Sequence, residues 1–467
     1  MKPARPTFQN LRRAFTVVLV VALCLWMCRS GVAAAAESTA IVGKNGWLFV
    51  RHEVVLETME KDAQTAFGLI ESFNRMLAQN QIMLVVLVVP SKMETYAEQL
   101  PDDFKVSAYM RGFNDTVQSA LRAGGVQSVD LKSVLRKAAL QDSALPVFFR
   151  LDTHWTPTGA MLAAQAVQAG IMASPSLKQA LDAVPAEKYQ LSWASKPTRQ
   201  RSRDIVRYLP VGTPDYPPEE VLRFNVSRQD GNRMSLLGGA APGGEIGLVG
   251  SSFSGEATGF ADALRYTLQH NLVNFSLNAD AGQWAVMRAY LRDDAFQVKR
   301  PRLVIWEMPE RAVGWRPSYP YRQPRYKIDD SEWLLQVAAL VAQTCAPAAI
   351  TAKLEPGGAY KGKGAVTGIA TREADFVEIS FDKPVDHHSY LSARVTSDGS
   401  NQIRIEGFEG GVLAREFSVD VAGDELAHSL KTPLSLSSKG LSRIKLYPGK
   451  TNAFGVADVQ VCRYLEN

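Results

Sequence analysis

Apolar residues in the first three quarters of the chain follow two patterns that alternate along the sequence. A continuous apolar run, typical of a strand buried on both faces of a parallel sheet, occupies residues 82–89, and further strands are predicted at 126–131, 147–151, 245–250, 272–275 and 303–307. Apolar residues at helical spacing occupy 61–80, 106–123, 132–140, 160–171, 260–270, 282–293 and 332–344. This alternation predicts a doubly wound α/β fold.

The pattern changes after Cys345. Helical spacing disappears, and residues 376–381, 403–405, 412–419 and 442–447 alternate between apolar and polar positions. Short alternating strands at this spacing are typical of a β-sandwich. The chain therefore divides into a predicted α/β domain, residues 37–344, and an all-β sandwich, residues 345–467.

The first 36 residues have the organisation of a signal peptide. A basic stretch precedes the apolar run 16–28, and Ala34–Ala36 offer small residues for cleavage before Glu37. An uncleaved N-terminal anchor is the alternative. Removing the segment takes away five basic residues and leaves 47 Lys and Arg against 47 Asp and Glu. The mature chain is then formally neutral, so its charge indicates no nucleic-acid partner.

Two cysteines, Cys345 and Cys462, remain in the predicted mature chain. Export to an oxidising compartment favours a disulfide between them, and this pair brackets the predicted sandwich. The spacing of Cys and His residues matches no zinc site, so we expect no metal.

Candidate chemistry begins at Asp152 and His154. They follow the predicted strand 147–151 and precede the predicted helix 160–171, at the end of a sheet where α/β proteins usually place chemistry. Because the two residues are two positions apart, the Asp152 carboxylate can orient the His154 imidazole. The alternative interpretation is a buried histidine satisfied by a local aspartate, which carries about equal weight on spacing alone.

Ser252 is the predicted nucleophile. It stands where the buried run 245–250 turns into a helix, between Gly250 and Gly255, which permit a tight turn. There the first helical N–H groups would face an oxyanion, and His154 would remove the hydroxyl proton. Ser251 is one residue nearer the strand and competes for this role. Ser254 reads as an N-cap.

Five motifs carry a family resemblance: Gly43–Phe49, Pro90–Lys92, Asp152–Trp155, Gly250–Ser254 and Ile305–Arg311. Together they resemble the AlgX/AlgJ family of periplasmic alginate O-acetyltransferases, which have an SGNH-hydrolase-like domain. The resemblance extends over the whole predicted α/β domain, and Asp-Thr-His-Trp is its most specific part. The order Asp, His, Ser inverts that of ordinary SGNH hydrolases, which implies a circularly permuted domain. The added β-rich segment is similar to the carbohydrate-binding sandwich of the AlgX members.

The resemblance implies a mechanism, a location and partners. Carried over by position, Asp152, His154 and Ser252 match the family's catalytic triad. Ser252 would accept an acetyl group and pass it to a hydroxyl of mannuronate in alginate or a similar anionic exopolysaccharide, with no cofactor. The implied location is the periplasm, the implied donor a membrane-bound O-acyltransferase, and the implied neighbours proteins of a polymer export complex.

One departure from the family's pattern affects the sandwich. Residues 345–467 contain no Trp, so sugar stacking there would use Tyr or Phe, or binding would depend on Lys and Arg. Two other functions remain open at this point. The same triad chemistry would serve a polysaccharide acetylesterase, whose acceptor is water. A non-catalytic binding subunit of an export complex is the second alternative, and an exposed, misoriented Ser252 would favour it.

Overall fold

The protein is described from a computed structural model. The structure describes residues 39–464 except 142–144, 201, 230–244, 278–280, 321–325, 358–365, 371–374, 398–401, 421–426 and 449–450. The predicted signal peptide lies outside the described residues. Within the described part of the chain, no helix combines the length and the apolar character needed to cross a membrane.

A five-stranded parallel sheet forms the centre of the N-terminal region. Its order is β10 (Val273–Ser276), β9 (Ile246–Gly250), β11 (Leu303–Pro309), β3 (Met83–Val89) and β4 (Gln127–Val129). Every residue of β9 and β11 is buried, as their continuous apolar sequence predicts. Because all five strands are parallel, their carboxyl ends share one edge, and the loops that follow them can build a common site.

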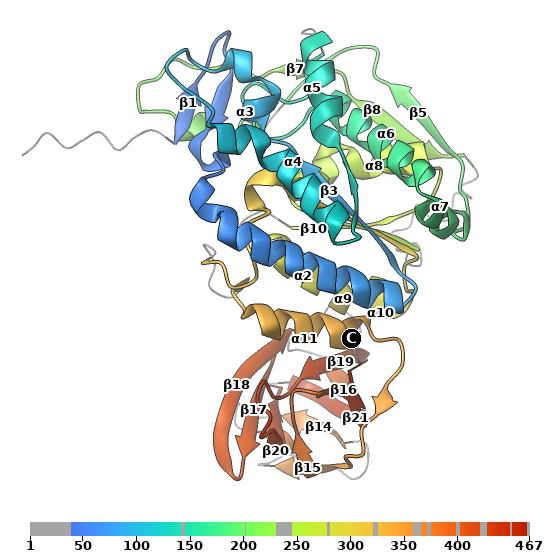
Figure 1. Cartoon of the computed structure of the whole chain (residues 1–467). Helices are drawn as coiled ribbons and strands as arrows, with labels where there is room; N and C mark the ends of the chain where they lie inside the picture. The colour runs from blue at the N-terminus through green and yellow to red at the C-terminus, as the bar shows by residue number, and fades with distance from the viewer. Residues whose placement is uncertain are drawn as a thin grey trace, which may run out of the picture.

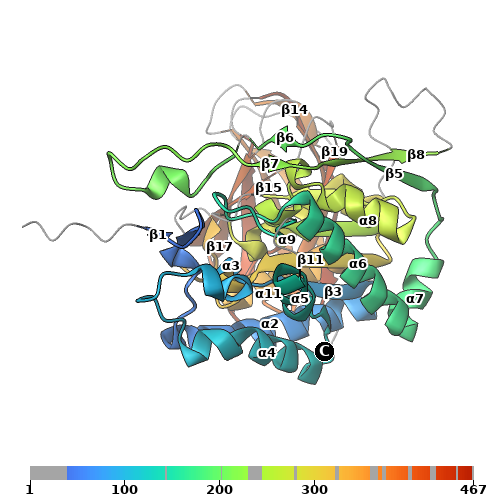
Figure 2. The ribbon, with the colours of Figure 1, turned by 90° about the horizontal axis from the view of Figure 1, so that it is seen from above.

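Helices cover the sheet. They are α2 (Glu60–Gln79), α4 (Ala108–Ala123), α5 (Leu131–Gln141), α6 (Pro157–Ala173), α8 (Phe260–Leu268) and α9 (Gln283–Arg292). A further helix, α11 (Asp330–Val341), packs against α2 and α9. Figure 2 shows α2 and α4 on one side of β3 and β11, with α6 and α8 on the other. The Trp306 ring of β11 meets Phe73 of α2 at 5.7 Å and Trp284 of α9 at 5.3 Å. These contacts lie in the larger of the two main hydrophobic cores.

The predicted strand 147–151 is wrong. In place of a ladder, a single antiparallel bridge joins Phe148 to Trp155. The backbone N–H of Phe149 donates to the His154 carbonyl, and that of Thr156 donates to the Val147 carbonyl. Apart from exposed Arg150, the segment is buried and apolar because it closes a compact loop against the core. Burial without a ladder gives the same sequence pattern as a central strand.

The irregular stretch after α7 (Pro175–Asp182) forms two short antiparallel ribbons. One pairs β5 (Tyr189–Trp193) with β8 (Phe224–Arg228), and the other pairs β6 (Thr198–Arg199) with β7 (Glu220–Val221). The segment between β6 and β7 returns to the His154 loop, where it completes the site described below. A third ribbon, β1 (Ala40–Val42) with β2 (Leu48–Val50), lies near the same loop.

The C-terminal region consists of two antiparallel sheets around a second apolar core. The first contains β12 (Ala346–Pro347), β21 (Thr451–Arg463), β16 (Ser389–Ser397) and β19 (Ala427–Pro433), with β14 (Val366–Ala370) paired to β21. The second contains β13 (Ala352–Gly357), β15 (Phe376–Val385), β20 (Leu441–Tyr447), β17 (Gln402–Glu409) and β18 (Val412–Asp420). Figure 1 shows this region below α11.

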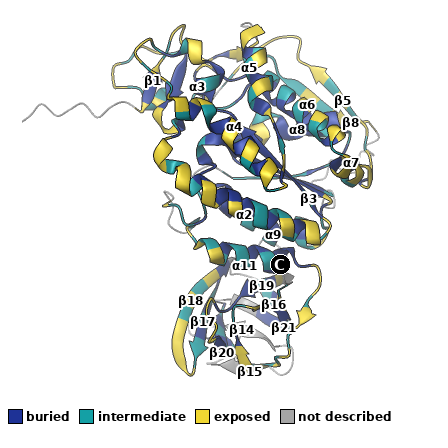
Figure 3. Cartoon of the chain, viewed as in Figure 1, coloured by how far each residue is buried: buried dark blue, intermediate teal, exposed yellow. Residues whose placement is uncertain are grey.

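These two regions confirm the predicted fold class, an α/β domain followed by a β-rich sandwich. In Figure 3 the buried residues form a separate interior in each region. The predicted disulfide is also confirmed, because Cys345 and Cys462 are bonded and tie the segment after α11 to β21. Across the junction, Arg415 of β18 pairs with Glu332 of α11, and both side chains are largely buried.

Candidate active site

The structure brings the three predicted site residues into one hydrogen-bonded line. His154 Nδ1 lies 2.6 Å from Asp152 Oδ1, and His154 Nε2 lies 2.8 Å from the Ser252 hydroxyl oxygen. The loops that carry them are 98 residues apart in sequence. With the proton on Nδ1 donated to Asp152, Nε2 is the acceptor for the Ser252 hydroxyl, which is the tautomer a general base requires.

Asp152 is fully buried, and four groups donate to its carboxylate. Oδ1 accepts from the ring and the backbone N–H of His154. Oδ2 accepts from the Ser202 hydroxyl and from the backbone N–H of Asp204, at 3.1 Å. Burial opposes ionisation, but the His154 hydrogen bond and charge, with the Ser202 bond, outweigh it and hold the pKa of Asp152 below its usual range.

The same interaction acts in the other direction on His154. Burial disfavours the imidazolium, yet the hydrogen bond and negative charge of Asp152 prevail and raise the pKa of His154 above 6.5. Asp152 therefore stabilises the protonated ring that forms when His154 removes a proton.

Ser251 and Ser252 point to different partners. The Ser251 backbone N–H donates to the buried carboxylate of Glu307 at 2.7 Å, and its hydroxyl also donates to Glu307. Ser254 donates its hydroxyl to the same carboxylate at 2.9 Å. Glu307 thus fixes the turn by binding Ser251 and Ser254, and Ser252 is the serine that bonds His154.

Three details of the turn differ from the sequence-based expectation. The N-cap is Ser251, whose hydroxyl accepts from Phe253 N–H, and not Ser254. Two short 3₁₀ turns follow β9, so α8 begins only at Phe260 and its N–H groups do not directly follow Ser252. Gly250 is required by a close approach, since a Cβ there would lie 2.3 Å from the Ser254 hydroxyl and 2.5 Å from Glu307 Oε2.

Phe253 couples the two loops mechanically. Its ring lies 5.0 Å from the His154 ring and 5.2 Å from the buried Trp155 ring. Trp155 in turn packs on Phe260 at the start of α8. Because each loop presents an aromatic ring to the other, their separation is fixed by packing as well as by the hydrogen bond.

Sequence reasoning missed the groups that hold the Asp152 loop. Lys92, 1% exposed, donates to the carbonyls of Leu48, Arg150 and Asp152 at 2.6, 3.0 and 3.1 Å. Burial lowers the pKa of Lys92 to about 8, although nearby carboxylates, Glu53 foremost, oppose this shift. Glu219 accepts from the backbone N–H groups of Arg150 and Leu151. Only the Pro90–Lys92 motif signalled Lys92, and no local pattern signalled Glu219, Ser202 or Asp204.

Asp204 also places a second carboxylate near the imidazole. Its oxygens accept from the backbone N–H and the hydroxyl of Thr153, and Oδ2 lies 3.9 Å from His154 Nδ1. Ligand atoms of Asp152, His154 and Asp204 lie within 4.8 Å of one another, so a cation is geometrically conceivable. However, Asp152 and His154 lie at direct hydrogen-bond distance, and the Asp204 carboxylate already accepts two hydrogen bonds from Thr153. These contacts fit a hydrogen-bonded triad better than a ligand set.

Comparison with known proteins gives a consistent family. The family model described as "SGNH hydrolase-like domain, acetyltransferase AlgX" matches residues 40–310. Probable alginate O-acetylase AlgJ of Pseudomonas aeruginosa PAO1 is 29% identical over 316 residues, which cover 64% of this chain and 75% of that protein. Alginate biosynthesis protein AlgX of Pseudomonas putida KT2440 is 22% identical over 361 residues, covering 74% and 70%.

Solved structures share the fold. The structure of Pseudomonas aeruginosa AlgX aligns with a TM-score of 0.62 at 15% identity, over 91% of this chain and 95% of that one. The O-acetyltransferase domain of Pseudomonas putida AlgJ aligns with a TM-score of 0.52 at 24% identity, over 64% and 98%. Because the family model extends over more than half of the chain, this protein belongs to the AlgX acetyltransferase family with its SGNH hydrolase-like domain.

Proposed function

We propose that the protein transfers acetyl groups to hydroxyls of alginate or a similar anionic polysaccharide, with the acetyl carried on Ser252. The observation that carries this proposal is the position of His154, whose two ring nitrogens bond a buried carboxylate and the Ser252 hydroxyl. The names of the relatives support the acceptor class, since they are alginate O-acetylase and alginate biosynthesis proteins.

In the first half-reaction, Ser252 Oγ attacks the acetyl carbonyl of the donor while His154 Nε2 takes the hydroxyl proton. The tetrahedral intermediate collapses, and the leaving group departs with that proton. Acetyl-Ser252 remains. Among the described residues, the backbone N–H of Ser252 has no hydrogen-bond acceptor, and we assign it as one donor to the oxyanion.

In the second half-reaction, a sugar hydroxyl attacks acetyl-Ser252 and His154 removes its proton. The ester bond to Ser252 breaks, and the serine oxygen recovers a proton from His154. These steps need only the triad, an acetyl donor and the acceptor. We further propose a periplasmic location, a membrane-bound O-acyltransferase as the source of acetyl groups, and an export complex nearby, as the family resemblance implies.

The sandwich is proposed to bind the polymer. Its aromatic rings on the second sheet are covered by the protein's own cations: Arg404 lies over Tyr447, Arg443 over Phe408 and Lys445 over Phe376. Rings covered in this way are not available to stack on sugars, and of the covering cations Arg404 and Arg443 also pair with Glu406 and Glu378. The sandwich also contains Lys361, Lys363 and Lys450, which lie outside the described residues.

The test is to incubate the purified protein with p-nitrophenyl acetate, locate the adduct by mass spectrometry, and then add oligomannuronates. We expect acetyl on Ser252 and its transfer to the sugar. Acetyl on Ser251, or full activity of Ser252→Ala, would contradict the assignment. Discharge of acetyl-Ser252 to water alone, with oligomannuronate present, would point to an esterase. The short Ser252–His154 contact counts against a non-catalytic subunit.

A further inference from the structure

A cleft of about 980 Å³ lies between the sandwich and the α/β region, at the amino ends of β9 and β11, whereas Ser252 follows the carboxyl end of β9. Its sandwich wall comes from β16, β19 and β21, and its other wall from the end of α2 and the segments that enter β9 and β11. Glu245 precedes β9 and Ser252 follows it. With five residues in β9, the cleft and Ser252 are separated by about 17 Å of strand.

Positive charge dominates the cleft. Five cationic and three acidic side chains line it: Lys299, Arg300, Arg302, Arg394 and Lys431, and Glu245, Asp294 and Asp458. Lys299 pairs with Glu245 at 3.6 Å, and Arg394 pairs with Asp458 at 2.7 Å. Three cations, Arg300, Arg302 and Lys431, then remain against one carboxylate, that of Asp294.

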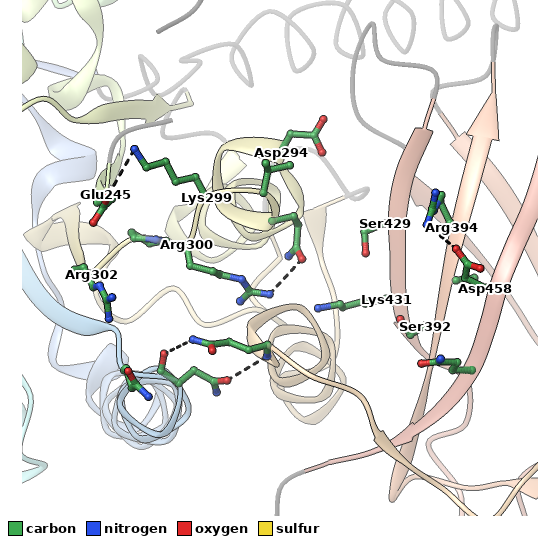
Figure 4. A pocket seen from close by; sticks show the side chains of 18 residues that line it. Glu245, Asp294, Lys299, Arg300, Arg302, Ser392, Arg394, Ser429, Lys431 and Asp458 are labelled. Carbon is green, nitrogen blue, oxygen red and sulfur yellow. Dashed lines mark hydrogen bonds and ion pairs between the residues drawn. The ribbon is translucent and has the colours of Figure 1, made fainter. Parts of the chain in front are cut away.

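Arg300 and Lys431 extend toward one another from opposite walls (Figure 4). Within the described residues neither has a carboxylate partner; Arg300 donates to Val341 and Ala342 carbonyls, and Lys431 donates to the Ala342 carbonyl at 2.7 Å. These carbonyls end α11, whose dipole offers about half a negative charge. The two positive charges of Arg300 and Lys431 are therefore only partly offset by the carboxyl end of α11, and a net positive charge remains in the cleft.

The electrostatic environment is consistent with this excess. Burial, together with the nearby Arg300 charge, lowers the pKa of Lys431 to about 8. Burial lowers the pKa of Arg300 to about 10. An anion in the cleft would relieve both effects, because it replaces lost hydration and offsets the repulsion between the two cations. Water-exposed Arg302 adds a further charge at the rim, with no ion pair among the described residues.

The other lining groups suit a carbohydrate. Ser392 and Ser429 on the sandwich wall, with Gln460, provide neutral hydrogen-bonding groups beside the cations, whereas Asn80 and Gln343 bond each other. Sugar hydroxyls pair with such groups, while carboxylates pair with Lys and Arg. A polymer that carries both kinds of group along its length matches this lining better than a small inorganic anion does.

We propose that the interdomain cleft binds a segment of a polyuronate, with Arg300 and Lys431 contacting its carboxylates. This inference rests on the proposed function for the identity of the polymer. The site lies away from Ser252, so it holds the acceptor chain to the enzyme without taking part in the chemistry. Its contribution should therefore appear in the affinity for long chains.

The test measures binding of long oligomannuronates to the full chain by calorimetry, without an acetyl donor. Lys431→Met removes the charge and keeps most of the side-chain volume, while Lys431→Arg keeps the charge. We expect Lys431→Met to weaken binding about tenfold at low salt, as loss of one charged hydrogen bond would, and Lys431→Arg to retain most of the affinity. Lys439→Met is the matched control, since Lys439 is an exposed sandwich lysine outside the cleft.

Arg302→Gln is the second variant, because its exposed side chain can be changed without disturbing α11. It should weaken binding in the same direction even if Lys431→Met does not fold. Affinity should also fall between 0.1 and 1 M salt, where the screening length shrinks from about 10 to about 3 Å. Wild-type affinity in both Lys431→Met and Arg302→Gln, or equal binding of a neutral oligosaccharide, would overturn the proposal. Since no transfer is measured, a failed acetylation assay leaves this result intact.

Discussion

The triad and the interdomain cleft both gather charged side chains, yet they compensate charge differently. At the triad, Asp152 accepts four hydrogen bonds inside the protein, and Lys92 donates three. In the cleft, Arg300 and Lys431 bond carbonyls at the end of α11, and among the described residues neither has a carboxylate partner. A network satisfied internally fixes geometry, as an active site requires. A surplus of charge leaves a place for a ligand.

The largest effect is expected where the satisfied network acts on substrate. Ser252→Ala and His154→Ala should each lower acetyl transfer by roughly 10⁴-fold or more, and the double variant should be little worse, because triad members act as a unit. Transfer to oligomannuronate, followed by mass spectrometry, measures this. Ser437→Ala, in the sandwich, is the control. Additive losses in the double variant would argue against a shared mechanism.

Removing the carboxylate tests whether the network also supports the fold. Asp152→Asn should lower transfer by about 10⁴-fold, since the ring can adopt the wrong tautomer. Because Asp152 is buried, Asp152→Ala leaves donors of His154, Ser202 and Asp204 without an acceptor, at a cost of about 3 kcal/mol in total.

Urea unfolding of Asp152→Ala gives the stability change, with Ser252→Ala as the control expected near wild type. An unfolding free energy unchanged in Asp152→Ala would mean that water replaces the lost acceptor. The hydrogen bonds to Asp152 would then position the triad without stabilising the fold.

Lys92 is a buried cation whose ammonium donates to three carbonyls, whereas Lys431 lines the cleft. Lys92→Met should misplace the Asp152 loop and lower transfer about 100-fold, since small displacements of reacting groups are costly. It should also destabilise the protein by about 2 kcal/mol, because three carbonyls lose a donor. The acid limb of the pH profile should move with the loop, which a purely structural role would not cause. Lys188→Met provides the control.

The smallest expected effect is the response to pH. His154 must be neutral to accept the Ser252 proton, and its pKa is raised above 6.5. Transfer should therefore fall about tenfold per pH unit below that raised value, with the midpoint above 6.5. The rate of Ser252 acetylation between pH 5 and 9 measures this. A midpoint below 6.5 would show that burial outweighs Asp152 at His154.

Much of the molecule was accessible from local patterns. Continuous apolar runs located β3, β9 and β11 because strands covered on both faces need no polar positions. Asp152, His154 and Ser252 were identified from their places beside such runs. The same rule failed at residues 147–151, which are buried except for Arg150 but form no ladder with the parallel sheet. The long strands β16, β19 and β21 were missed.

Local sequence accounts for what depends on near neighbours: the alternation of strands and helices, the change of texture after Cys345, and the pairing of the last two cysteines. Long-range packing accounts for the rest. It directs Ser251 to Glu307 and Ser252 to His154, and it brings Ser202 to Asp152 across 50 residues. Arg300 and Lys431 meet in the same way. Periodicity indicates which face of an element is buried. It does not indicate which residues that face contacts, because those contacts depend on the tertiary structure.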